Sequence, residues 1–122
     1  MIYEFNPQIY PRKIWIYIGE DEEKVKNYFI EDGSIKLSKR YYAITCNVRK
    51  KGTNMLGYLI WFHKKSEVTP SISAHEATHA ALHIIDDIGG DVDLKNQEYI
   101  SYLIDWIVEC IYKVKNIKKE ST

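Results

Sequence analysis

The stretch His75-Glu76-Ala77-Thr78-His79 has the pattern H-E-x-x-H, which places two imidazoles four positions apart. On an α-helix, residues at this spacing lie one above the other, so both imidazoles can reach one ion from the same side. Glu76 is rotated by about 100° from His75 and borders the same face. A carboxylate there can take a proton from a metal-bound water without binding the metal. We therefore predict a helix on which His75 and His79 bind zinc and Glu76 is the general base.

A catalytic zinc site usually has three protein ligands and one open position, so we expect a third ligand. Glu98 lies 19 positions after His79, near the start of a second strongly helical segment. In this respect the sequence resembles the gluzincin metallopeptidases, in which a Glu on the next helix follows H-E-x-x-H. The resemblance covers about residues 71–112, and the sequence also resembles small H-E-x-x-H proteins of phages and bacterial mobile elements. It implies that His75, His79 and Glu98 hold one zinc ion per chain and that Glu76 is catalytic.

The chain departs from the gluzincin pattern at one supporting position. Thermolysin-like enzymes carry, four residues after the ligand Glu, an Asp that orients a ligand histidine. This chain has Tyr102 there, and Asp105, about one turn further on, is a candidate substitute. The alternative metzincin pattern, H-E-x-x-H-x-x-G-x-x-H, does not fit, because Leu82 stands at the glycine position and Ile85 at the third histidine.

Other polar residues near the motif have competing interpretations. His83 lies one turn beyond His79, and we expect a surface or supporting position for it rather than a ligand role. His63 follows a predicted strand and could contact substrate, although a strand-end histidine without a role is more common. Tyr102 could polarise a substrate carbonyl, but packing near the site explains it equally well. Four further acids lack the spacing of a calcium-binding loop, and we expect them in a solvated turn: Asp86, Asp87, Asp91 and Asp93.

Length and composition predict one soluble domain over residues 1–122. The 122 residues suffice for a single core, and 45% of them are hydrophobic. Lys and Arg number 17, as do Asp and Glu, so no bulk charge favours nucleic acid or a membrane surface. Cys46 and Cys110 are expected to be free thiols. No basic leader or apolar run of 18 residues is present, so we expect a cytoplasmic protein without a membrane span.

The expected elements follow from hydrophobic periodicity and from turn residues. We predict an extended arm over 1–11, strands over 12–18, 41–49 and 55–62, and helices over 21–30, 71–88 and 96–115. The first helix should end at Asp32-Gly33, the second should begin at Ser71 or Ser73, and the last two strands should form a hairpin. The predicted class is α+β: a small, mostly antiparallel sheet of about three strands, packed on the H-E-x-x-H helix and a C-terminal helix, as in a zincin core.

These features favour a zinc-dependent hydrolase that acts on a peptide or protein. An extended substrate would add main-chain hydrogen bonds to a strand edge beside the site, and the strand over 55–62 is the expected one. Two alternatives remain open from the sequence. The first is a non-catalytic zinc-binding or protein-interaction domain on the same scaffold, and the second is a small α+β module without metal. Oligomeric state and substrate specificity are not indicated by the residues.

Overall fold

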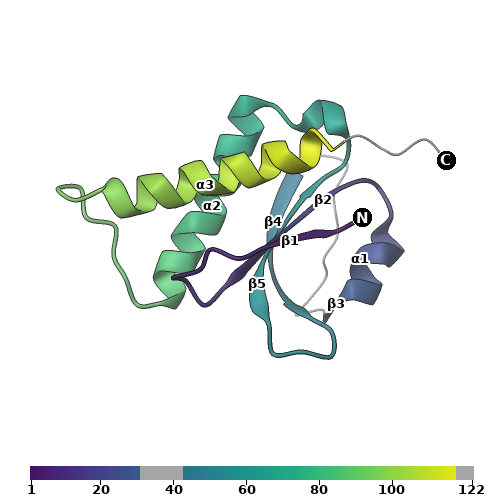
Figure 1. Cartoon of the computed structure of the whole chain (residues 1–122), viewed down its shortest axis with the longest axis horizontal. Coiled ribbons are helices and arrows are strands. Elements are labelled where there is room, and N and C mark those ends of the chain that lie inside the picture. The colour runs from purple at the N-terminus through teal and green to yellow at the C-terminus, as the bar shows by residue number, and fades with distance from the viewer. Residues whose placement is uncertain (31–42, 118–122) are drawn as a thin grey trace.

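The computed structural model of the chain describes residues 1–30 and 43–117. The predicted helix end at Asp32-Gly33 and the first two residues of the strand over 41–49 lie outside these ranges. Figure 1 shows the arrangement. In chain order the elements are β1 (Tyr3–Phe5), β2 (Lys13–Ile18), α1 (Glu22–Tyr28), β3 (Phe29–Ile30), β4 (Ala43–Lys50), β5 (Leu56–Phe62), the short 3-10 helix η1 (Lys65–Glu67), α2 (Pro70–Asp87) and α3 (Glu98–Lys115).

The five strands form one mixed sheet in the order β1-β2-β5-β4-β3. β2 and β5 at its centre are parallel, with Lys13 opposite Gly57 and Ile18 opposite Phe62. The other three pairs, β1–β2, β5–β4 and β4–β3, are antiparallel. The α+β class is retained, but the predicted sheet of about three mostly antiparallel strands is wrong in strand number and in the direction of its central pair.

Two short strands account for the difference in number. Within the predicted extended arm, Tyr3 pairs with Ile16 of β2, so the arm extends the sheet as β1. The predicted helix over 21–30 ends at Tyr28, and Phe29–Ile30 pairs with β4 instead. Phe29 is fully buried in the strand conformation, and burial of its ring stabilises the strand relative to a continued helix. Strands of two or three residues carry too little periodicity to be recognised locally.

Both faces of the sheet are covered by helices. On one face α2 and α3 pack against inward side chains of β2 and β5, including Ile14, Ile16 and Ile60. On the other face α1 packs against Trp15 and Leu59. Residues Ile14–Tyr17 and Gly57–Phe62 are therefore buried on both sides of their strands. This explains why these two strands are continuously apolar instead of alternating.

The N-cap of helix α2 lies two to four residues earlier than predicted. Thr69 is its N-cap and accepts a hydrogen bond from the backbone of Ile72 (3.3 Å), while Pro70 occupies the first turn, where its missing N–H costs nothing. Neither Ser71 nor Ser73 is the cap. The helix ends as predicted before Gly89, which has the left-handed φ of 76° that ends many helices.

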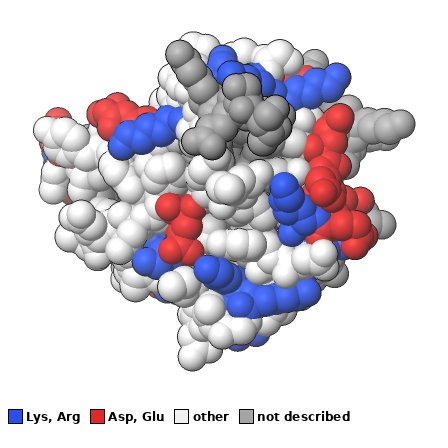
Figure 2. Space-filling model, turned by 45° about the vertical axis from the view of Figure 1, so that its right-hand side comes forward, with Lys and Arg blue, Asp and Glu red and all other residues white. Residues whose placement is uncertain are grey.

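Surface charge is mixed on the face that Figure 2 shows, where basic and acidic side chains lie next to one another. Among the described residues, no helix combines the length and the apolarity needed to cross a bilayer.

Candidate functional site

The H-E-x-x-H turn of α2 faces β4 across a shallow groove of about 350 Å³, here called the histidine groove. In the described part of the chain, its lining residues come from two elements: Ala43, Ile44 and Thr45 of β4, and His75, Glu76, His79 and His83 of α2. The helix presents these polar side chains toward β4 because its opposite side is apolar. Ala77, Ala80 and Ala81 are fully buried against the sheet and α3.

The two motif histidines converge. Nε2 of His75 lies 3.1 Å from Nε2 of His79, and the two rings stand nearly perpendicular to one another. Two nitrogens that bind one tetrahedral zinc at about 2.0–2.1 Å lie about 3.3 Å apart. Both side chains are exposed on the groove, so the pair is accessible. The donor type, the separation and the accessibility all fit a zinc ion.

Glu76 lies beside this pair with its two carboxylate oxygens in different environments. The residue is only 6% exposed. Its Oε1 accepts a hydrogen bond from Thr45 Oγ1 (2.9 Å), and its Oε2 lies 3.8 Å from His75 Nε2. One oxygen is therefore anchored to β4, and the other faces the histidines. The same hydroxyl of Thr45 is 3.3 Å from the backbone carbonyl of Glu76.

Thr45 was not identified from the sequence as a site residue. It is the hydroxyl-bearing residue in the otherwise apolar run Ala43–Cys46 of β4. A hydroxyl at an inward position of a covered strand needs a hydrogen-bond partner, and this was the available signal. The partner could not be found locally, because Glu76 is 31 positions away.

The thiol of Cys46, next to Thr45, has a raised pKa. Burial, together with the negative charge of Glu76, raises the pKa of Cys46 to about 11. A thiol with this pKa stays protonated at neutral pH, and the thiolate is the form that attacks substrates or binds metals. This environment therefore disfavours Cys46 as a nucleophile.

His83 completes the wall of the groove one turn beyond His79. Its ring stacks on the ring of Tyr58 (centroids 5.4 Å apart). The Tyr58 hydroxyl donates to Asp87, which also pairs with Arg12 (3.2 Å). Burial, and then the hydrogen bond to Asp87, raises the pKa of Tyr58, so its hydroxyl remains a donor. This network holds His83 against β5.

Glu98, the predicted third ligand, does not lie with the histidine pair. Among the described residues, no three His, Cys, Asp or Glu side chains are close enough to hold a metal together. Glu98 is exposed at the first turn of α3, and the residues from Asp91 to Gln97 before it are exposed as well. Ligation by Glu98 would require this connection to shift, and little packing opposes such a shift. Its assignment stays a prediction.

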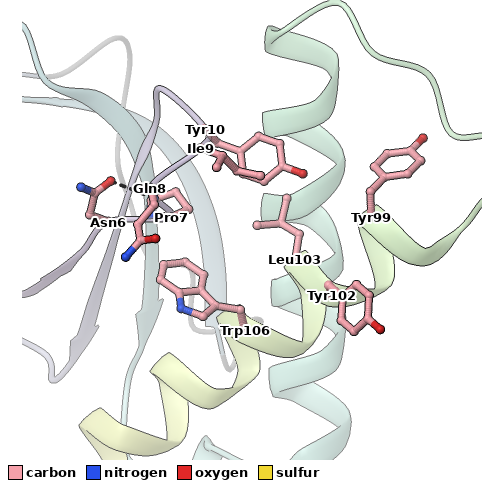
Figure 3. Close-up of a pocket in the computed structure, with 9 residues that line it drawn as sticks. All are labelled: Asn6, Pro7, Gln8, Ile9, Tyr10, Tyr99, Tyr102, Leu103 and Trp106. Atoms are coloured by element: carbon pink, nitrogen blue, oxygen red, sulfur yellow. Dashed lines mark hydrogen bonds between the residues drawn. The ribbon is translucent and has the colours of Figure 1, made fainter.

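The remaining sequence candidates lie outside the groove. Tyr102 is 68% exposed and lines a separate hollow between α3 and the β1–β2 connection (Figure 3). Asp105 is exposed on the polar face of α3. His63 lines a third cavity, with its Nδ1 3.7 Å from Glu20.

The strand expected to bind an extended substrate has no free edge. β5 lies between β2 and β4 and pairs with both along its length, so the expectation for 55–62 is wrong. The strand that lines the groove is β4. Within the described residues, β3 pairs with β4 only at Arg49 and Lys50, and residues 43–48 pair with β5 alone.

Comparisons with known proteins leave the family open. No protein-family model matches the chain, and no solved structure matches it. The chain is similar to the DNA mismatch repair protein MutL of Buchnera aphidicola subsp. Acyrthosiphon pisum, from strains 5A and APS, with 28% identity over 96 residues in each case. The match covers 78% of this chain but only 16% of each relative.

Proposed function

We propose that this chain is a zinc-dependent hydrolase that cleaves peptide bonds. The observation that carries the proposal is the 3.1 Å approach of the His75 and His79 Nε2 atoms beside a buried carboxylate. A closed structural zinc site has no use for a base beside an open position, whereas a hydrolytic site needs one. Glu76 has the position of that base, because its Oε2 faces the histidines and its Oε1 is held by Thr45.

The division of work between the residues follows from this geometry. His75 and His79 would hold the zinc ion, which when bound supplies a Lewis acid for the scissile carbonyl and lowers the pKa of water. Glu76 Oε2 takes the proton of the attacking water and passes it to the leaving amine. Thr45 keeps the carboxylate in a single orientation, which reduces the reorganisation needed for each proton transfer.

The substrate we propose is an extended peptide that lies along β4. Ala43, Ile44 and Thr45 form one wall of the groove and stand directly opposite the histidines. A peptide that adds to a strand edge gains main-chain hydrogen bonds, which hold it without regard to sequence. His83, held by its stacking on Tyr58, would contact side chains of the peptide.

The decisive experiment replaces Glu76 by Gln, which keeps size and polarity but removes the base. We expect unchanged zinc content and fold, with peptide hydrolysis slower by about a hundredfold or more. Rates would be measured on whichever peptide the wild type cleaves in a broad panel. Glu109→Gln, an exposed position on α3, is the matched control and should keep full activity. Equal hydrolysis by wild type and Glu76→Gln would refute the mechanism.

A second candidate is a zinc-binding domain without catalysis. It is favoured by the lack of a third ligand beside the histidine pair among the described residues. This candidate predicts one zinc per chain and no hydrolysis of any peptide in the panel. It also predicts that Glu76→Gln alters no measured property except local stability.

A further inference from the structure

A cavity of about 590 Å³ lies at the carboxyl ends of the parallel strands β2 and β5. Ile18 and Gly19 leave β2 there, and His63 and Lys64 leave β5. Beside a parallel pair, the space beyond the carboxyl ends of the strands is a common location for ligands. The rest of the wall comes from Met1 and Tyr3 near the N-terminus, from Lys65 of η1, and from Val114, Lys115 and Ile117 at the end of α3.

The charged residues that line this wall in the described part of the chain are all basic. They are Lys64, Lys65 and Lys115, and His63 lines the cavity with them. The whole chain has equal numbers of basic and acidic residues, and the two kinds alternate on the face in Figure 2. Lys115 is fixed in place, because its Nζ donates to the backbone carbonyl of Val68 (2.6 Å). A concave wall with one sign of charge attracts a ligand of the opposite sign.

His63 contributes a buried ring nitrogen, Nε2, that lacks a hydrogen-bond partner among the described residues. Its Nδ1 faces Glu20 Oε1 at 3.7 Å, and the imidazolium form, in which both ring nitrogens are donors, would present Nε2–H to a ligand. A buried polar group of this kind is costly unless something in the cavity forms a hydrogen bond with it.

The remainder of the wall is apolar. Tyr3, Ile18, Val114 and Ile117 form it, and the cavity volume lies in the range of small-molecule sites, about 300–1,000 Å³. We propose that this cavity binds a small organic anion whose carboxylate or phosphate lies against the lysines and His63, and whose apolar body covers Ile18 and Val114. The proposal is independent of the zinc site.

The test compares four probes by isothermal titration calorimetry on the full chain: decanoate, decyl phosphate, 1-decanol and inorganic phosphate. We expect decanoate or decyl phosphate to bind at one site, and the stronger of the two identifies the headgroup. 1-Decanol and inorganic phosphate should each bind at least tenfold more weakly, because each lacks one half of the ligand. Equal binding of 1-decanol would overturn the role of the lysines, and equal binding of inorganic phosphate would overturn the role of the apolar wall.

The variants locate the site. Lys64→Glu with Lys65→Glu should weaken binding of the amphipathic anion at least tenfold, and His63→Phe should weaken it severalfold. Lys51→Glu with Lys95→Glu changes the net charge equally at exposed positions outside the cavity and should leave binding unchanged. Thermal unfolding checks that each variant is folded. Failure of both anions to bind the wild type, or equal weakening by the two double variants, would reject the proposal.

Discussion

The histidine groove and the aromatic pocket of Figure 3 differ in the chemistry that their walls can perform. The aromatic pocket, about 430 Å³, lies between α3 and residues 6–10. Its lining residues within 1–30 and 43–117 include no charged residue and no histidine: Asn6, Pro7, Gln8, Ile9, Tyr10, Tyr99, Tyr102, Leu103 and Trp106. The histidine groove, about 350 Å³, has three histidines and a glutamate. The larger hollow offers contact surface, while the smaller one has the residue types that a metal site and a general base need. Cavity size therefore does not indicate which of the two carries the proposed site.

The largest expected effect is on zinc itself. Wild type should hold about one zinc per chain, and His75→Ala or His79→Ala should lose it, because each removes one of the two converging nitrogens. Elemental analysis of purified and zinc-reconstituted protein measures this. His63→Ala is the control and should retain zinc. If reconstituted wild type held no zinc, the histidine groove would not be a metal site, and this proposed difference from the aromatic pocket would be refuted.

The third ligand gives the next largest effect. We expect Glu98→Ala to weaken zinc binding by at least about tenfold, and His83→Ala to leave it nearly unchanged. His83 is the proper comparison because it already lies in the groove, whereas Glu98 must move to reach it. A competitive zinc titration ranks the two variants. The reverse ranking would exclude Glu98 and leave the two-histidine site in place.

Thr45→Val should have a moderate effect that separates orientation from metal binding. Valine has nearly the shape of threonine but cannot donate to Glu76 Oε1. Loss of a hydrogen bond to a charged group is worth roughly 1.5–3 kcal/mol, so hydrolysis should fall about tenfold or more, at unchanged zinc content. Thr45→Ser keeps the hydroxyl and should restore most of the rate. Full activity in the valine variant would show that Thr45 does not position the base.

The smallest expected effect is in the aromatic pocket. Tyr102→Ala removes a largely exposed ring that lines this pocket and lies outside the groove. We expect zinc content to be unchanged and the hydrolysis rate to stay within about twofold of wild type, because surface substitutions rarely act at a distance. A tenfold loss of zinc content or of hydrolysis rate would show that the aromatic pocket contributes to the activity of the histidine groove, which would contradict their separation.

What the sequence could predict depended on how local the determining interactions are. The positions of α2 and of His75, Glu76 and His79 follow from spacing within a single turn, so the helix and its polar face were predicted correctly. The end of α2 follows from Gly89 in the same way. Thr45 could not be placed, because its role depends on a residue on a different element.

The pairing of the strands in the sheet depends on non-local interactions and could not be predicted from the sequence. The parallel pairing of β2 with β5 joins Lys13 to Gly57, two residues far apart in the chain. The pairing requires a residue without a side chain at position 57, since an added Cβ would lie 2.1 Å from the Lys13 carbonyl oxygen. Periodicity describes a strand but not its partner, so this glycine in an apolar run could not be assigned a role in advance.

The order of the elements along the chain has a consequence for folding. The described lining residues of the histidine groove fall between Ala43 and His83, on a local hairpin and the helix that follows it. β2 is synthesised before β5, so it cannot pair until β5 has been made. The pairing of β2 with β5 also closes a long loop. Loops of this kind form slowly compared with hairpins and helices. The rate of folding should therefore be set by the attachment of the N-terminal strands, while the segment that carries the groove assembles first.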